Sequence, residues 1–418
     1  MVGIAGGVPL GTVITNFETG VGGTLQEVGL LIALGAMLGK LLADSGGADK
    51  IVSTLLAKAS GSAIPWAMAL VAMIIGLPMF FEIGLVLLLP VIVLVAKKSG
   101  LKLMRVAIPA LAGLSVLHGL IPPHPGPLIA ISALKADLGI TLAFGIIVAI
   151  PTVVICGPLF SILAARWVPV DAPALAGGVD TTESAASKEV KRPPSFGVTL
   201  FTILFPVLLM LSKAVVDLVY PGKTNNPAVK VFFDFVGEPL MALVLAVLLA
   251  MVTFGYAVGF KSPDITSRLG ASVGPIAGVM LIVGAGGGFK QTLIGAGVGD
   301  SVAKAATGSN ISVLLLGFLI AVALRLATGS ATVATTTAAA IVAPVAVAAG
   351  LSSTHLALLA LAIGAGSLFL SHVNDAGFWL VKEMFGLTVG QTFKTWSLME
   401  TLVSVVGFGF VMLLSAFV

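Results

Sequence analysis

The chain contains little charge and a single cysteine, and each shortage narrows the class of protein it can belong to. Only 10% of its 418 residues are charged, whereas a soluble protein carries about 25%. The net charge is only +4 and is scattered along the chain, so we expect no nucleic-acid partner. Cys156 is the only cysteine, which excludes an internal disulfide. Neither an HExxH nor a CxxC motif occurs, so nothing indicates an enzyme or a metal site.

The abundant feature is apolar sequence, since 58% of the residues are hydrophobic. Apolar runs near the ~20 residues that cross a bilayer as a helix recur along the chain. These runs lack the two-residue alternation of a transmembrane barrel, and the 50 glycines suit close packing of helices in lipid. The sequence therefore predicts an all-α integral membrane protein that crosses the bilayer several times.

One long hydrophilic stretch, residues 166–196, divides the chain. It contains the sequence DTTESAASKEVKRPP, which is typical of a solvated linker. We therefore expect two structural halves, residues 1–165 and residues 197–418, joined by this linker.

The two halves resemble each other at a nearly constant offset. GAMLGKLLADSGGADK corresponds to GGGFKQTLIGAGVGD, with Lys290 lying 250 residues after Lys40. HGLIPPHPGP corresponds to SHVNDAGFW, with His372 lying 254 residues after His118. NFETGVGG and LLLPVIVLVAKKSGL also have counterparts in the second half, SRLGASVG and IVAPVAVAAGL. We interpret these ordered matches as an internal duplication, which is typical of secondary transporters.

The flanks of two matching apolar segments indicate that the copies are inverted. Segment 64–96 is followed by four basic residues within 97–105 and by no acid, which favours the cytoplasmic side. The matching segment, 311–349, has no basic residue in its flanks. Both segments exceed one span and contain a polar interruption, LPMFFEIG or RLATGSATVATTT. Each is therefore predicted to form a re-entrant hairpin.

Two further polar interruptions predict two broken helices. The consecutive Pro122 and Pro123, followed by Pro125 and Pro127, must break a helix because proline lacks the backbone donor. SHVNDAGFW lies at the matching place in the second half. Non-helical backbone at membrane depth survives only against protein or a water-filled cavity, and its freed groups can bind an ion. An ordinary loop at the membrane surface is the alternative.

Three titratable residues are candidates for carrying a proton. Glu82 lies within GLPMFFEIGLVLLLP, and an ionised carboxylate at membrane depth costs ~2.5–3.5 kcal/mol on insertion scales, which favours the protonated form. Asp375 and His372 lie together in SHVNDAGFW, and a histidine titrates near neutral pH. The alternative for each is a structural side chain held by a hydrogen bond or a paired charge.

A second set of polar side chains is suited to holding a substrate. Arg325 could bind a carboxylate in bidentate fashion, or it could pair with an acid or snorkel. The hydroxyls of Ser330, Thr332 and Thr335 both donate and accept, which suits a polyol or sugar acid, although threonines also pack helices. The remaining candidates lie in the two predicted helix breaks and are His118, His124 and Asn374.

The stretch GAGGGFKQTLIGAG resembles a glycine-rich dinucleotide fingerprint. That motif requires a preceding strand, and an acidic residue about 20 positions later, within a βαβ unit. Because the stretch lies in a predicted membrane helix, we interpret its glycines as helix-packing residues and expect no cofactor.

At these motifs the sequence resembles the gluconate permease (gluconate:H+ symporter, GntP) family. The motifs, which span essentially the whole chain, are GVGGTL, GAMLGKLLADSGGADKI, HGLIPPHPGP, GGGFKQTLI, LRLATGSATVA and SHVNDAGFWLVKEMFGLTVGQTFKTWS. The resemblance implies a proton-coupled symporter for gluconate or a related sugar acid in the bacterial cytoplasmic (inner) membrane. It also implies an elevator-type homodimer with paired re-entrant hairpins and broken helices. Members usually begin with further hydrophobic segments. Since Met1 corresponds to Met251 by the repeat, we expect this chain to lack the leading helices of the first repeat.

Several alternatives stay open. Resembling families carry idonate, fructuronate or D-serine through similar motifs, and a carrier of this kind could be coupled to Na+. A channel would show neither saturation nor uphill transport, and a membrane enzyme would consume its substrate.

In the mechanism we expect, the sugar acid binds near the bilayer midplane between the hairpin tips and the helix breaks. Glu82 or Asp375 then carries the coupled proton.

Overall fold

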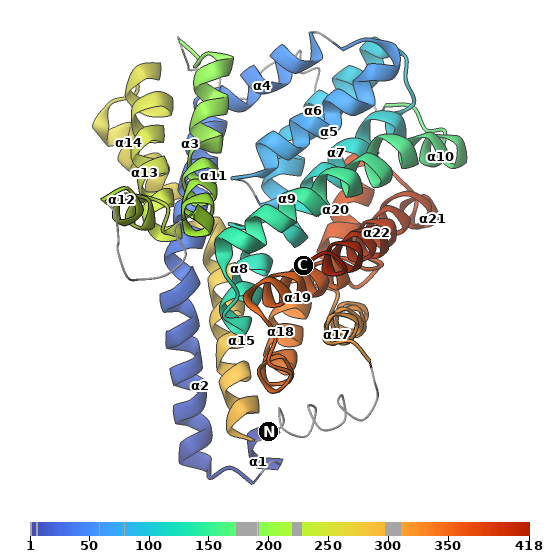
Figure 1. Cartoon of the computed structure of the whole chain (residues 1–418). Helices are drawn as coiled ribbons and strands as arrows, with labels where there is room; N and C mark the ends of the chain where they lie inside the picture. Colours follow the sequence, from blue (N-terminus) through green and yellow to red (C-terminus); the bar gives the residue numbers. More distant parts are fainter. Residues whose placement is uncertain are drawn as a thin grey trace.

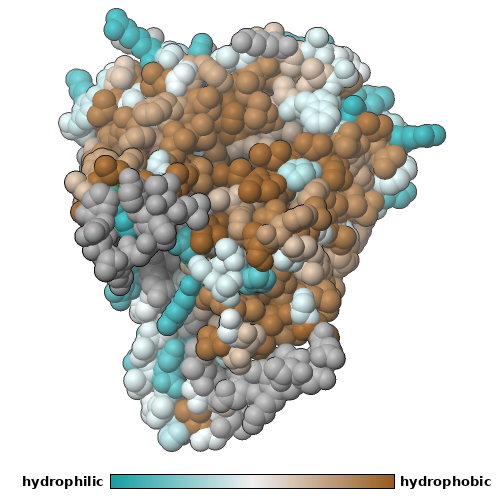
Figure 2. Space-filling model, in the orientation of Figure 1, coloured by the Kyte–Doolittle hydropathy of each residue, from teal (hydrophilic) through white to brown (hydrophobic). Residues whose placement is uncertain are grey.

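The computed structural model describes the chain except residues 1, 6, 58, 79, 173–189, 191, 220–227 and 297–310. Every regular element among the described residues is a helix, so the predicted all-α fold is confirmed. Six helices in this part of the chain are long and apolar enough to cross a bilayer, and the bent pair α3 and α4 makes a seventh. Figure 2 shows a broad apolar surface on the face where α9 (Leu138–Val154) lies in Figure 1. Large apolar side chains of α9 and of α10 (Phe160–Trp167), such as Ile147, Ile150 and Ile162, are exposed.

The N-terminal region begins with the short helix α1 (Val2–Ala5), which a turn separates from a long rod that bends once. The elements of the rod are α2 (Leu10–Thr24), η1 (Leu25–Gly29), α3 (Leu30–Asp44) and α4 (Gly47–Leu56). The axis turns by 64° between α3 and α4, at Gly46, whose φ of 74° is left-handed. Glycine adopts this conformation without steric cost.

Helix α2 packs along α15 (Ala277–Gly295) through glycines (Figure 1). A Cβ at Gly20 would collide with the backbone of Gly287, and one at Gly288 would meet the ring of Phe17. Gly284 lies against Val21 in the same way. The stretch that resembles a dinucleotide fingerprint is therefore a helix-packing surface, as predicted.

Each half contains a helical hairpin. The first joins α5 (Ile64–Gly76) to α6 (Phe81–Ser99) and follows η2 (Gly61–Ala63). The second joins α17 (Val313–Thr328) to α18 (Ala331–Ala348) through Gly329 and Ser330. This turn is shorter than the polar interruption in the sequence, because Arg325 still belongs to α17 and the threonines already belong to α18.

After each hairpin, two helices follow that are separated by non-helical residues. Helix α7 (Leu103–Leu120) ends before four non-helical residues, and α8 (Pro125–Leu134) follows. Helix α19 (Ser353–Ser367) ends before residues 368–375, and α20 (Ala376–Phe385) follows. Both predicted interruptions of helical structure are thus present.

The remaining helices surround these elements. They are α9 (Leu138–Val154), η3 (Ile155–Leu159), α10 (Phe160–Trp167), α11 (Phe196–Val219), α12 (Ala228–Val236), α13 (Pro239–Ala250), η5 (Met251–Gly255), η6 (Tyr256–Val258), α14 (Ser262–Ala271), η7 (Gly274–Ile276), α21 (Val389–Thr392), η8 (Phe393–Ser397) and α22 (Leu398–Ser415). The predicted linker 166–196 overlaps α10 by two residues and α11 by one. Most of its central part lies outside the described residues.

Candidate functional site

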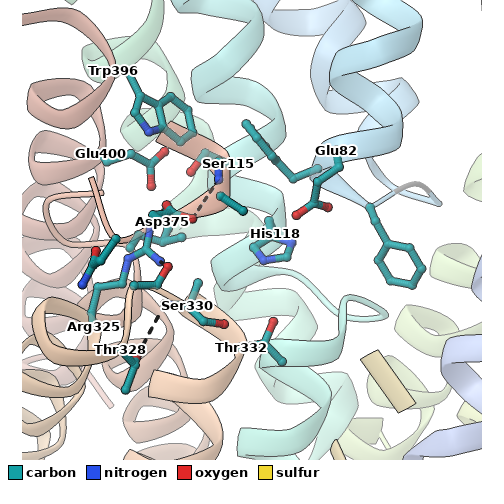
Figure 3. A pocket seen from close by; sticks show the side chains of 18 of the residues that line it. Glu82, Ser115, His118, Arg325, Thr328, Ser330, Thr332, Asp375, Trp396 and Glu400 are labelled. Atoms are coloured by element: carbon teal, nitrogen blue, oxygen red, sulfur yellow. Dashed lines mark hydrogen bonds and ion pairs between the residues drawn. The ribbon is translucent and has the colours of Figure 1, made fainter. Parts of the chain in front are cut away.

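A pocket of about 310 Å³ lies where the hairpin turns meet the helix breaks (Figure 3). This volume is at the lower end of the ~300–1,000 Å³ typical of small-molecule sites. The wall is built from the start of α6, the end of α7, the turn between α17 and α18, the break before α20, and the start of α22. Segments from both halves of the chain therefore share one pocket.

Four helix N-termini meet around this pocket. Lining residues come from the first turns of α6 (Phe81, Glu82), α8 (Pro125), α18 (Ala331, Thr332) and α20 (Ala376, Gly377). A helix N-terminus carries roughly half a positive charge and attracts anions. The pocket is therefore electrostatically suited to a small anion.

Side chains cap two of these helices at the pocket wall. Ser330 Oγ accepts a hydrogen bond from the Val333 amide at 3.3 Å at the start of α18. Asp375 Oδ1 accepts one from the Gly377 amide at 2.9 Å at the start of α20. Such caps satisfy backbone donors that have no partner within the helix. They hold the pocket ends of both helices in place.

Arg325 joins the second hairpin to the break before α20. Its side chain is 4% exposed, and its Nη2 lies 2.5 Å from Asp375 Oδ2. Its Nη1 donates to the Gly329 carbonyl oxygen at 2.6 Å. Of the two alternatives for this arginine, the structure shows the pair with an acid. A bidentate grip on a substrate carboxylate would require that pair to open.

Further contacts hold the same two segments together. Asn374 Nδ2 donates to the Leu326 carbonyl at 2.9 Å, and His372 Nε2 lies 3.3 Å from the same oxygen. Gly329 has φ +72°, and a Cβ there would collide with the Asn374 backbone. Only glycine allows this approach.

Aromatic side chains form another part of the pocket wall. Trp396 Nε1 donates to Ser371 Oγ at 2.7 Å, and Ser371 in turn donates to Asp375. The Trp396 ring lies 5.2 Å from that of Phe81, which also meets the His118 ring edge-on. The pocket lining therefore combines polar side chains with aromatic ones.

The structure brings seven of the ten predicted site residues into the pocket wall. They are Glu82, His118, Arg325, Ser330, Thr332, Asn374 and Asp375.

The other three predicted residues do not line the pocket. His124 is 3% exposed, and its Nδ1 lies 2.9 Å from the Ile121 carbonyl oxygen. Thr335 is 1% exposed and lies beside Gly126 of α8. His372 reaches the Leu326 carbonyl instead. These side chains lie against backbone beside the pocket rather than in its wall.

Sequence reasoning missed several lining residues, of which Glu400 is the most informative. Ser115, Thr328 and Trp396 were also missed. Glu400 is 2% exposed and is a single acid in the apolar stretch that follows Trp396. The insertion cost that singled out Glu82 applies equally to this residue. The signal was present in the sequence.

Among the described residues, no group of three His, Cys, Asp or Glu side chains could hold a metal ion. Residues 270–274 do fit the GxSxG pattern, which in hydrolases lies on a strand-to-helix turn. Here Ser272 caps the end of α14 and donates to the Leu269 carbonyl. This serine therefore lacks the setting of a nucleophile.

Comparisons with known proteins agree with this architecture. Residues 1–418 match the family described as GntP family permease. The gluconate permease of Pseudomonas aeruginosa is 49% identical over 415 residues, covering 99% of this chain and 90% of that relative. The Gnt-II system L-idonate transporter of Escherichia coli is 42% identical, covering 97% and 90%.

A solved structure shares the fold. The crystal structure of the Alcanivorax borkumensis YdaH transporter superimposes with a TM-score of 0.70, covering 98% of this chain and 90% of that one. The sequence identity is 16%, so this similarity concerns the fold alone.

Proposed function

The chain belongs to the GntP permease family, and from this premise we propose that it is a proton-coupled symporter of the bacterial inner membrane that imports gluconate. A closely related sugar acid such as idonate is the alternative substrate, since a relative named as an L-idonate transporter is 42% identical. The observation that carries the proposal is the meeting of four helix N-termini around one polar pocket.

A sugar acid matches the chemistry of this pocket. Its carboxylate is attracted by the helix N-termini, and its hydroxyl groups find partners that both donate and accept. Ser330, Thr332 and Thr328 supply hydroxyls from the turn of the second hairpin. Asn374 and His118 complete the polar lining.

The charges in the pocket favour coupling to protons. Among the described lining residues, the carboxyl groups of Glu82, Asp375 and Glu400 share the wall with one guanidinium, that of Arg325. If all were ionised, an anionic substrate would enter a site with excess negative charge, which is unfavourable at low dielectric. Protonation of a pocket carboxyl removes this repulsion. The anion and the proton then bind together, as symport requires.

The wider mechanism follows from the repeated order of elements. Each half places a hairpin before a broken helix, as expected for an inverted repeat with two re-entrant hairpins and two broken helices. In an elevator-type homodimer, the hairpins and broken helices would carry the pocket across the membrane past a dimerised scaffold.

Uptake into proteoliposomes tests the proposed function. Gluconate uptake is expected to saturate, to accumulate when the outside is acidic, and to collapse with a protonophore. Uptake that ignores the pH gradient and depends fully on Na+ would refute proton coupling. Uptake without saturation would indicate a channel.

Competition identifies the substrate. Unlabelled gluconate should inhibit the uptake of labelled gluconate most strongly. Idonate should inhibit it less strongly, and fructuronate and D-serine should inhibit it least. Stronger displacement by D-serine than by gluconate would exclude a sugar-acid carrier.

A further inference from the structure

Glu400 is the most deeply buried carboxyl group in the pocket wall. It lies near the start of α22, which continues α21 and η8 without a break, is 2% exposed, and lines the pocket. Its Oε1 has no hydrogen-bond partner among the described residues, and neither has Ser404 Oγ one turn later. An ionised carboxylate without a paired cation is very costly to bury. The neutral, protonated form is therefore the one that this environment accepts.

The other two carboxyl groups have different surroundings. Asp375 pairs with Arg325 and accepts hydrogen bonds from Ser371 and from the Gly377 amide. Glu82 is an exposed residue in the first turn of α6, so it is less shielded from solvent than Glu400. Glu400 is buried and its Oε1 has no partner among the described residues, so it has no comparable anchor for a negative charge.

The charged and titratable groups around Glu400 do not replace such an anchor. Arg325 of α17 and Asp375 act on it with opposite signs, and they are already paired with each other. Cys156 of η3 interacts electrostatically with it but carries no positive charge. His118 of α7 lines the same pocket. Ser115 of α7 supplies a hydrogen bond, but no charge.

We propose that Glu400 binds the coupled proton, an assignment that rests on the proposed symport function. An anion in the pocket repels an ionised Glu400, so the substrate binds when Glu400 carries its proton. Once the substrate has left, water enters the pocket and takes the proton from the carboxyl oxygen. One proton thus accompanies each substrate anion.

This coupling predicts how binding depends on pH. If only the protonated form binds the anion, the apparent Kd rises about tenfold per pH unit above the titration of Glu400, by linkage between the two equilibria. The same linkage predicts uptake of about one proton per gluconate bound in that pH range.

The experiment measures gluconate Kd against pH, with proton uptake in weak buffer, for full-length protein in nanodiscs. Wild type should show the tenfold slope, and Glu400→Gln should bind with a flat profile and no proton uptake. Glu400→Asp, which keeps a carboxyl, should retain both. Glu383→Gln, at an exposed site outside the pocket, is the control that keeps the wild-type profile, and Glu82→Gln should also keep the slope.

The outcomes separate the two levels of the proposal. A Glu400→Gln profile with the wild-type slope, or a flat profile in Glu82→Gln, overturns the assignment to Glu400 and leaves symport intact. Wild type that binds gluconate without any pH dependence overturns proton symport itself. Should Glu400→Gln fail to fold, Ser115→Ala tests the assignment instead. Loss of the hydrogen bond between Ser115 and Glu400 must move the pH at which gluconate binding weakens. An unmoved pH contradicts the proposal.

Discussion

The ion pair between Arg325 and Asp375 is expected to be the most sensitive contact of the pocket. Its side chains are 4% and 13% exposed, and removing one partner of a buried pair costs ~3–5 kcal/mol. Asp375 also caps α20 through the Gly377 amide, and loss of such a cap costs ~0.5–2 kcal/mol. Asp375→Ala should therefore lower the free energy of unfolding by roughly 3.5–7 kcal/mol, a large share of the ~5–15 kcal/mol that stabilises a typical protein.

A double-mutant cycle tests the origin of this loss. Arg325→Met, Asp375→Ala and the double variant would be unfolded by denaturant titration in mild detergent micelles. Because the double variant leaves no unpaired buried charge, its loss should fall short of the summed single losses by about 2–3 kcal/mol. Asp171→Ala breaks an exposed pair with Lys102 and should change stability little. Single losses that add within ~0.5 kcal/mol would refute the pairing argument.

Two further predictions concern the turn of the second hairpin. Gly329→Ala should abolish uptake, because its Cβ collides with the Asn374 backbone. Gly350→Ala, also left-handed but with no atom within 4 Å, should keep uptake and lose only the ~1–2 kcal/mol of unfolding free energy that backbone strain costs. Equal losses of uptake in the two variants would contradict the steric argument. Thr332→Val removes a hydroxyl from the pocket wall and should raise the KM for gluconate several-fold, since a lost hydrogen bond is worth ~0.5–1.5 kcal/mol. Thr335→Val should keep the wild-type KM, and an equal rise in both would show that Thr335 contacts the substrate.

The interruptions of the helices could be read from local sequence. Consecutive prolines such as Pro122 and Pro123 cannot continue a helix, and the matching SHVNDAGFW stretch is too polar for an uninterrupted membrane helix. The hairpins followed from apolar segments that are too long for one span. Such features depend on neighbouring residues and on the cost of burying polar groups, so one sequence is enough to predict them.

The orientation of individual side chains could not be read in this way. Thr332 and Thr335 lie in the same hydroxyl-rich stretch, yet only Thr332 lines the pocket. Residues three positions apart lie on the same face of a helix, one above the other, and Thr335, nearly one turn further along α18, lies beside Gly126 of α8. His124 lies directly between Pro123 and Pro125, but its ring bonds to the Ile121 carbonyl. Composition identified the segments, and the packing of neighbouring elements selected the residues that line the pocket.

By itself the sequence determined that this chain is an all-helical membrane protein and where helical structure is interrupted. The reason is that hydrocarbon penalises every exposed polar group and every unpaired backbone donor, so apolar length and proline placement leave few alternatives. Only the tertiary structure decided which side chains meet. Arg325 pairs with Asp375, and Glu400 lies with them in one pocket, because helices from distant parts of the chain pack together there. Those contacts are set by helix packing and phase, on which local sequence carries no direct signal.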